Sequence, residues 1–411
     1  MSSPLSRIPR AASEAEDVSA GALRPDEPFG IYVHFPFCGV RCPYCDFAVD
    51  TRADIPHDAY ADAVIAELAA RTPWFRGAGP LVSIYFGGGT PGLWRPDALG
   101  RVIDAARAAF GERNPSPTLG ASLEITVEVN PGEVGRRELA ALRAAGANRL
   151  SIGVQALEDR LLVALGRTHS AAACPAAVRA AREAGFDNVS IDLMFGVPGQ
   201  TIDDWRRDVE AAVTLAPEHV SAYALTVERG TAFGSLDRAG RLPRPDDDVT
   251  AVMFEHARAA FASAGLAPYE VSSYARPGRR SRHNQLYWKL TPYLGLGASA
   301  ASLRPLADGT AWRFSNPRST DVYLRAPTPR HVERRSAADL ENEALWLGLR
   351  TVDGIDRLAH RARHGCDPVD GRQAAIDAGV SAGWLTVDDA SLRLTPSGTL
   401  FADELAGRLW R

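Results

Sequence analysis

The feature that most limits how this chain can fold is a regular alternation of short apolar runs with helix-like segments over residues 29–228. The runs are rich in Val, Ile and Tyr and are bounded by Gly, Pro or Asn, which is typical of buried strands. Alternation at this spacing predicts parallel βαβ units in one sheet. We expect strands at residues 30–34, 81–86, 123–129, 149–154, 189–195 and 219–225.

Amphipathic segments separate these runs, and several begin with residues that cap helices. Thr201, for example, is followed by Asp203 and Asp204, and a hydroxyl followed by acidic residues favours the start of a helix. Six such units predict an α/β fold with a partial or open (β/α)6 barrel of the TIM type, instead of a closed barrel of eight units. We expect helices at residues 56–71, 96–110, 136–145, 171–184 and 201–215.

Changes in composition divide the chain into four regions. Residues 1–27 mix Ser, Pro, Ala, Arg and acids without the apolar stretch of a secretory signal, so we expect a disordered tail. Residues 28–240 form the predicted barrel core, and residues 241–328 are expected to complete it. Helices at 337–350 and 372–382, followed by a hairpin at 385–394, predict a small helical, winged-helix-like domain over residues 329–411.

Charge and hydropathy limit the partners and the location of the chain. The net charge is −4 and no basic stripe accompanies the predicted hairpin, so we expect no nucleic-acid binding. Apolar runs stay well short of the ~20 residues of a membrane span. The five cysteines do not suggest a disulfide framework, because three of them lie within eight residues. These features favour the cytoplasm.

The clustered cysteines, Cys38, Cys42 and Cys45, follow the first predicted strand as C-x3-C-x2-C. Three thiolates on one loop can surround a cubane iron–sulfur cluster, because soft sulfur suits iron. Such a cluster would leave its fourth iron open to a substrate or cofactor. Zinc is the alternative, with His34 as a fourth ligand, since structural zinc takes four. Three purely structural thiols are the remaining alternative.

Glycine and polar residues stand where the later predicted strands end. The carboxyl ends of successive barrel strands form the active site in such folds, and glycine there lets a ligand approach the backbone. Singly, each polar residue could be a solvated or structural group. Together they predict one binding site, made by Gly88, Gly89, Thr90, Glu128, Gln155, Arg167 and Asp192.

The motifs themselves carry a resemblance. The strings YVHFPFC, GGGTP, EVNP, SIGVQ, GRTH and DLMFGVPGQT, within residues 28–411, are similar to the radical-SAM superfamily, and specifically to oxygen-independent coproporphyrinogen III oxidase and its relatives. The resemblance implies a [4Fe–4S] cluster on the three cysteines. Its open iron would chelate the methionine part of S-adenosylmethionine, and one electron would release a 5′-deoxyadenosyl radical. It adds Tyr32 and Tyr44 to the expected cofactor-binding residues.

The family contains oxidases and a haem chaperone branch, and this chain resembles the latter. The oxidases carry a further cysteine, as C-x3-C-x2-C-x-C, and a longer N-terminal segment, whereas Asp46 and Phe47 follow Cys45 here. The string HNQLYW, from His283 to Trp288, resembles a motif that the chaperone branch uses for haem. Imidazole can ligate haem iron and aromatic rings offer it apolar faces, so His283, Tyr287 and Trp288 are the haem candidates. Alternatively, His283 is structural and the motif closes the barrel.

The resemblance implies a chaperone that binds haem, a [4Fe–4S] cluster and S-adenosylmethionine and delivers haem to respiratory membrane proteins, at the periphery of the membrane. Two alternatives are radical chemistry. One is the oxidative decarboxylation of coproporphyrinogen III to protoporphyrinogen IX, and the other is a reaction on an unrelated substrate. We expect no oxidase activity, although the scaffold for radical formation is intact. A cluster with three ligands per chain would also permit a homodimer.

Overall fold

The computed structural model describes residues 18–111 and 122–411 and contains a large open sheet. Its strand order is β12-β11-β10-β9-β1-β2-β3-β4-β5-β6-β8-β7, so the edge strands do not pair with each other. The six central strands run parallel in chain order, as the alternation predicts. They are β1 (Phe29–Phe35), β2 (Leu81–Gly88), β3 (Glu124–Val129), β4 (Arg149–Gln155), β5 (Val189–Phe195) and β6 (His219–Ala224).

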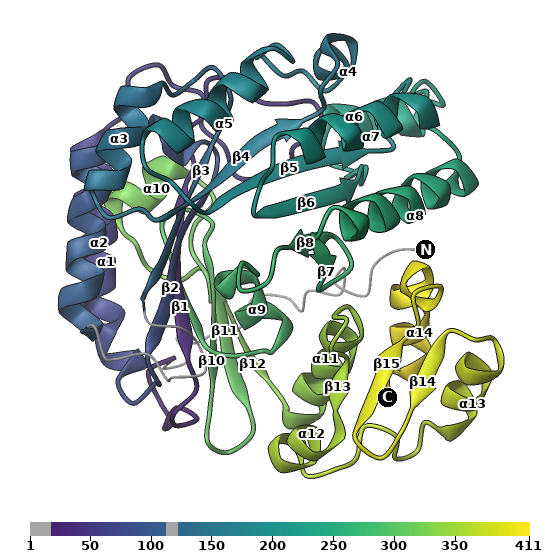
Figure 1. The fold of residues 1–411 in the computed structure, drawn as a ribbon. Helices are drawn as coiled ribbons and strands as arrows, with labels where there is room; N and C mark the ends of the chain where they lie inside the picture. The colour runs from purple at the N-terminus through teal and green to yellow at the C-terminus, as the bar shows by residue number, and fades with distance from the viewer. Residues whose placement is uncertain (1–17, 112–121) are drawn as a thin grey trace.

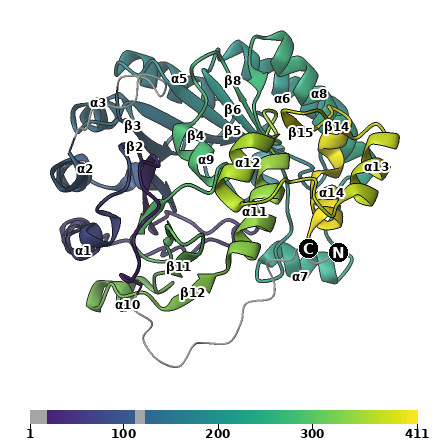
Figure 2. The same cartoon turned by 90° about the horizontal axis from the view of Figure 1, so that it is seen from below.

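Helices connect these strands and form an outer row around the curved sheet (Figures 1 and 2). The parallel order requires such crossovers, because each strand must return to the same end before the next begins. Apolar side chains of the strands are fully buried, for example Ile31 and Val33 of β1. The helices are α1 (His57–Arg71), α2 (Pro96–Phe110), α3 (Arg136–Ala144), α4 (Asp159–Ala164), α5 (Ala173–Glu183) and α6 (Ile202–Thr214).

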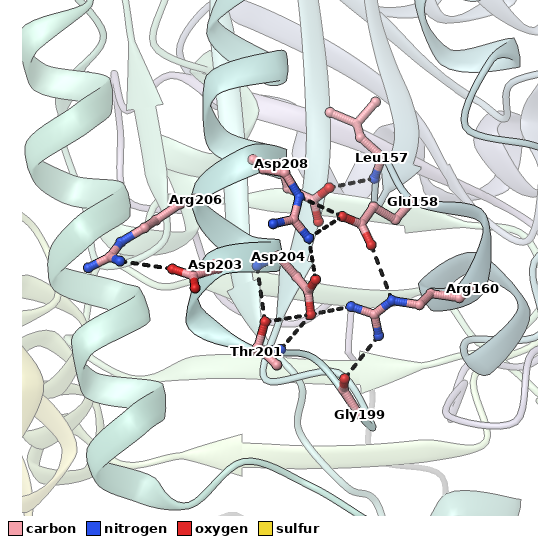
Figure 3. A network of polar contacts seen from close by, with 10 residues as sticks. Leu157, Glu158, Arg160, Gly199, Thr201, Asp203, Asp204, Arg206 and Asp208 are labelled. Carbon is pink, nitrogen blue, oxygen red and sulfur yellow. Dashed lines mark hydrogen bonds and ion pairs between the residues drawn. The ribbon is translucent and has the colours of Figure 1, made fainter.

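The start of α6 confirms the predicted cap (Figure 3). Thr201 Oγ1 accepts a hydrogen bond from the backbone N–H of Asp204 (3.2 Å), and the Asp204 carboxylate accepts one from the N–H of Thr201 (2.7 Å). Asp208 Oδ1 accepts from the N–H of Leu157 (2.9 Å), and Arg160 pairs with Asp204. This network ties α6 to the segment after β4, which carries part of the site described below.

Residues 232–335, which include the segment 241–328 expected to complete the barrel, extend both ends of the sheet and leave it open. Helix α8 (Asp247–Ser263) leads to β7 (Ala267–Pro268) and β8 (Ser273–Ala275), which continue the sheet beyond β6. Strand β9 (Tyr293–Leu296) pairs in parallel with β1. Three antiparallel strands follow, which the sequence did not predict: β10 (Ala301–Pro305), β11 (Ala311–Ser315) and β12 (His331–Arg335). The shorter helices of this part of the chain are α7 (Ala232–Arg238), α9 (Arg282–Trp288) and α10 (Thr320–Arg325).

The described part of the segment expected as a disordered tail, residues 18–27, lies against β10. The N–H of Arg24 donates to the carbonyl of Pro305 (3.1 Å), and the Arg304 guanidinium donates to the carbonyl of Ala20 (2.8 Å). Val18 and Leu23 are buried. These contacts hold residues 18–27 against the sheet, although composition alone predicted a disordered tail there. Residues 1–17 of the predicted tail lie outside the described part of the chain.

The C-terminal residues form a second, smaller unit with its own apolar core, beside α9 (Figure 1). Its three strands have the order β13-β15-β14. The sequence of helices followed by a hairpin agrees with the predicted winged-helix-like domain. The elements are α11 (Ala337–Leu349), β13 (Ile355–Asp356), α12 (Arg357–His364), α13 (Gln373–Ser381), β14 (Leu385–Val387), β15 (Ser391–Leu394) and α14 (Ala402–Leu409).

Helices that could cross a membrane would need to be long and apolar. Within residues 18–111 and 122–411, no helix meets both conditions.

Candidate functional site

A cavity of about 420 Å³ lies at the carboxyl ends of the parallel strands, where barrel-type folds bind their ligands. Residues from β2 to β6 and from the loop after β1 meet there, although they span more than 150 positions of the sequence. The structure brings together nearly all of the predicted cluster and cofactor residues in its lining. They are Cys38, Cys42, Tyr44, Cys45, Gly88, Gly89, Thr90, Glu128, Gln155, Arg167 and Asp192.

The three cysteines of the loop after β1 are free thiols that face this cavity and are half-buried. The loop is held by the N–H of Cys38, which donates to the carbonyl of Asp50 (3.0 Å). Thr90 Oγ1 lies 3.5 Å from Cys38 Sγ, and Arg167 Nη1 lies 3.8 Å from Cys42 Sγ. Three sulfur donors around one open space suit a cubane cluster, since iron prefers thiolate and the fourth corner can face the cavity.

Burial raises the pKa of the Cys38 thiol to about 11, and burial also raises that of Cys45. Metal must therefore displace protons when it binds to these cysteines, so its binding strengthens as pH rises.

His34 does not offer the fourth ligand that a zinc site would need. Its Nδ1 is paired with the hydroxyl of Tyr32 (3.0 Å) and its Nε2 with the carbonyl of Ala48 (3.0 Å). Both ring nitrogens are thus engaged, and burial lowers the pKa of His34 to about 4, so the ring is neutral. Tyr32, predicted to touch the cofactor, lies outside the cavity lining and holds His34 in place.

The glycine-rich end of β2 runs directly beside the cysteine loop. Gly88 has φ 110°, and a Cβ at this position would lie 2.4 Å from the His34 ring. A Cβ on Gly89 would lie 2.6 Å from the carbonyl oxygen of Phe37. A side chain at Gly88 would collide with the His34 ring, and a side chain at Gly89 would collide with the backbone of Phe37. These clashes explain why glycine occupies both positions.

Two half-buried carboxyl groups, those of Glu128 and Asp192, line the cavity. Glu128 accepts hydrogen bonds from the Tyr85 hydroxyl (2.8 Å) and the N–H of Gly88 (3.1 Å). Burial, with a contribution from Asp192, raises the pKa of Glu128 to about 7. Asp192 accepts from Ser151 Oγ (3.1 Å), and burial raises its pKa too. A cationic or hydroxyl-bearing ligand would stabilise their ionised forms.

Arg167 contributes a guanidinium group that hydrogen bonds hold in place, and Gln155 contributes a strained backbone conformation. The Arg167 guanidinium donates to the carbonyl of Gly153 (3.2 Å) and to the side chain of Asn130. Such a buried guanidinium can bind a ligand carboxylate. Gln155 has φ 65°, which is unusual for a residue with a side chain and is typical of functional sites. The pairing of β4 with β5 shifts register before it.

Sequence analysis did not select several lining residues, of which Asn130 is the best connected. Its Nδ2 donates to Thr90 Oγ1 (3.1 Å) and to Glu133 Oε2 (2.8 Å), and its Oδ1 accepts from Arg167. Asn130 therefore links the ends of β2 and β3 to the guanidinium. Its position directly after β3 is the same signal that indicated Glu128. The other lining residues that were missed include Glu133, Ser151, Met194 and Tyr223.

The three haem candidates lie outside the cavity lining. His283 is 1% exposed; its Nδ1 pairs with Ser83 Oγ (2.8 Å) and its Nε2 with the Tyr287 hydroxyl (2.8 Å). Its ring stacks on Tyr85 at 5.1 Å, and burial lowers its pKa to about 3. Trp288 lies instead below the Arg350 guanidinium of the C-terminal domain (5.8 Å). In this arrangement, His283 has no free nitrogen for iron.

Comparisons with known proteins agree with this architecture. The radical SAM superfamily matches residues 32–212, and the HemN C-terminal domain matches residues 336–401. The heme chaperone HemW of Mycobacterium tuberculosis is 35% identical over 395 residues, covering 94% of this chain and 96% of that protein. The heme chaperone HemW of Escherichia coli K12 is 33% identical over 383 residues, covering 92% and 97%.

Two further matches extend the comparison. The mitochondrial radical S-adenosyl methionine domain-containing protein 1 of Mus musculus is 34% identical over 392 residues, covering 91% of this chain and 86% of that protein. The solved structure of coproporphyrinogen III oxidase (HemN) from Escherichia coli, a radical SAM enzyme, has a TM-score of 0.78. It is 22% identical and covers 95% of this chain and 91% of its own, which confirms the predicted fold class.

The radical SAM superfamily match implies a [4Fe–4S] cluster and S-adenosylmethionine as cofactors. The cysteine loop and the strand-end cavity provide donors and space that fit both. With relatives of this identity over nearly its full length, the chain belongs to the radical SAM superfamily and, within it, to the HemW family.

Proposed function

We propose that this protein is a haem chaperone: it binds haem, holds a [4Fe–4S] cluster with S-adenosylmethionine, and delivers haem to respiratory membrane proteins. The observation that carries the proposal is the end of the cysteine loop. Asp46 and Phe47 follow Cys45 where the oxidases have a further cysteine. Support comes from the heme chaperones that match 92–94% of this chain at 33–35% identity.

In this proposal, Cys38, Cys42 and Cys45 would hold the cluster, which would supply one-electron chemistry toward S-adenosylmethionine. The backbone at Gly88 and Gly89 would leave room for the methionine part. The carboxyl groups of Glu128 and Asp192 bind its amino group and the ribose hydroxyls, and Arg167 binds its carboxylate. Tyr44, Thr90 and Gln155 complete the walls, and Tyr32 keeps the His34 ring beside Gly88. The half-buried cavity supports this assignment, because it limits the access of water to the site.

The HNQLYW motif is less accessible to haem than the cysteine loop is to a cluster. Ligation by His283 requires its ring to leave the hydrogen bonds to Ser83 or Tyr287. Exposing those buried polar groups costs roughly 1–3 kcal/mol each unless new partners replace them. We therefore favour the alternative role for the motif, in which His283 and Tyr287 close the inner side of β1 and β2 and haem binds elsewhere.

One anaerobic experiment separates the chaperone from the oxidase, whose fold this chain shares. The reconstituted protein is incubated with S-adenosylmethionine, a reductant and coproporphyrinogen III, and haem is titrated in parallel. We expect stoichiometric haem uptake and no protoporphyrinogen IX. Rapid formation of protoporphyrinogen IX would sink the chaperone proposal.

If no protoporphyrinogen IX forms and no haem is taken up, the alternative that remains is radical chemistry on another substrate. The Cys38→Ala variant is the matched control, because it tests whether haem uptake depends on the cluster.

Haem transfer is measured by adding membranes that carry a haem-free respiratory protein to the haem-loaded chain. Haem that stays with the chain would contradict delivery. Sedimentation with and without those membranes tests the proposed cytoplasmic and membrane-peripheral location, and sedimentation velocity tests the homodimer.

A further inference from the structure

A second group of metal-binding side chains lies in the C-terminal domain, apart from the cavity. Glu341 of α11, His360 of α12 and Cys366 each point one donor atom to the same place, and all these atoms lie within 4.8 Å of one another. Glu341 and His360 are buried, and Cys366 is a half-buried free thiol. Carboxylate, imidazole and thiolate are together the ligand set of zinc sites.

The end of α12 creates this proximity. The helix stops at Gly365, which has φ 75° and adopts the left-handed conformation that commonly ends helices. The chain reverses there, so Cys366 returns toward His360, which lies in the last turns of the same helix. Helix α11 supplies Glu341 from the opposite side. Two helices and a turn thus converge on one point.

The hydrogen bonds of Glu341 leave one of its oxygens facing the other two donors. Oε2 accepts a bond from Arg372 Nη2 (2.6 Å), and Arg372 is itself fixed by the carbonyl of Leu409 (2.6 Å). Oε1 lies 3.4 Å from His360 Nε2, which is long for a hydrogen bond. Tetrahedral zinc, with bonds of 2.0–2.3 Å, separates its ligand atoms by roughly 3.3–3.8 Å. The observed separation falls within this range.

A second histidine lies beside the group. His364 follows His360 by one helical turn, and their ring centroids are 4.6 Å apart. Its Nε2 is buried without a hydrogen-bond partner in the described part of the chain. Buried polar atoms are normally paired, so this nitrogen, on the residue whose ring contacts that of His360, is a candidate for a further ligand.

We propose that Glu341, His360 and Cys366 bind a divalent transition-metal ion with the ligand preference of Zn²⁺, and that His364 or a water completes the four ligands. A carboxylate and a thiolate balance the charge of the ion, and Arg372 orients the carboxylate from behind. The bound ion would fasten α11 to the end of α12. This site is independent of the cluster on Cys38, Cys42 and Cys45.

The test measures zinc binding to the full-length protein after its iron–sulfur cluster has been reconstituted, so that the cysteine loop is filled. Equilibrium dialysis against micromolar Zn²⁺, followed by metal analysis, should find one zinc per chain. Cys366→Ser, a conservative change at a half-buried position, should weaken zinc binding at least tenfold. Zinc should also raise the melting temperature of the wild type and not that of this variant.

His331→Ala is the matched control, because His331 is an exposed histidine on β12; it should bind zinc like the wild type. His360→Gln gives a second test that keeps the ring volume filled, with circular dichroism to check folding. Equal zinc binding by the wild type, Cys366→Ser and His360→Gln would overturn the proposal. So would a wild type that takes up no zinc at micromolar concentrations.

Discussion

The cysteine loop and the HNQLYW motif are both sequence motifs of the same family, but their donor atoms differ in access. The cysteine loop is open to a cavity, whereas the HNQLYW motif is closed, because its histidine is buried and hydrogen-bonded. The sulfurs of Cys38, Cys42 and Cys45 face a cavity of about 420 Å³. His283, by contrast, has both ring nitrogens paired and is 1% exposed. A ligand can reach the first motif as it stands, but must break internal hydrogen bonds to reach the second.

The difference teaches that residue type alone does not identify a ligand. Histidine, cysteine and carboxylate side chains bind metals only where their donor atoms are unpaired or paired weakly enough to exchange.

The largest effect is expected from the open motif. Replacing Cys38, Cys42 and Cys45 with Ala should abolish the broad visible absorbance after anaerobic reconstitution with iron and sulfide, because it removes the three thiols that line the cavity. Cys174→Ala is the control, since Cys174 is fully buried in α5 and should not affect the iron content. A full cluster in the triple variant would show that the ligands lie elsewhere.

The second effect concerns the closed motif. His283→Ala should lower the free energy of unfolding by roughly 2–4 kcal/mol, because it leaves a void and strands Ser83 and Tyr287. The haem spectrum should stay the same, since we expect no iron bond to this ring. Tyr287→Phe, which removes a single hydroxyl, should cost about 1 kcal/mol. A changed haem spectrum in His283→Ala, with the fold intact, would instead make His283 a ligand.

The smallest effect is a pH dependence. Because the folded state holds the pKa of Glu128 at about 7, it keeps a proton that the unfolded chain releases near its ordinary value of 4.5. The free energy of unfolding should therefore fall as pH rises from about 4.5 to 7 and then level off, by roughly 1–3 kcal/mol in the protein without its cofactors.

Glu128→Gln should reduce this slope, while burial that raises the pKa of Asp208 to about 7 leaves part of it, and denaturant titrations at pH 5 and pH 8 would measure the difference. Tyr85→Phe takes away a hydrogen bond that lowers the Glu128 pKa, so the fall in stability should extend to higher pH. An unchanged slope in Glu128→Gln would assign the effect to another carboxyl group.

The fold of the parallel core could be predicted, because each strand has a continuous apolar run and each crossover an amphipathic helix. The fifth strand, expected at residues 189–195, has those bounds in the structure. Strands β10 to β12 were missed, because the region is rich in glycine and aromatics and lacks a clear period. Strand-end position indicated the site residues well, since it depends on topology alone.

What the sequence could not show was pairing over long distances. Nothing near His283 in the sequence indicates that its ring nitrogen pairs with the hydroxyl of Ser83, 200 positions earlier. The same holds for Arg372 and Glu341. Tyr32 is a different case, because its hydroxyl pairs with His34 only two residues away, within β1, and the tyrosine does not line the cavity.

Arg363, in the last turn of α12, gives the C-terminal domain a role in completing the core. Its guanidinium donates to the carbonyls of Lys289 (2.6 Å) and Leu290 (2.7 Å), just beyond α9, and pairs with Glu27 near the start of the described chain (3.3 Å). A chain that is still being synthesised, with residue 363 not yet added, lacks this hydrogen-bond donor. A domain that is synthesised after both of the other segments therefore supplies the bonds that join Glu27 to the end of α9.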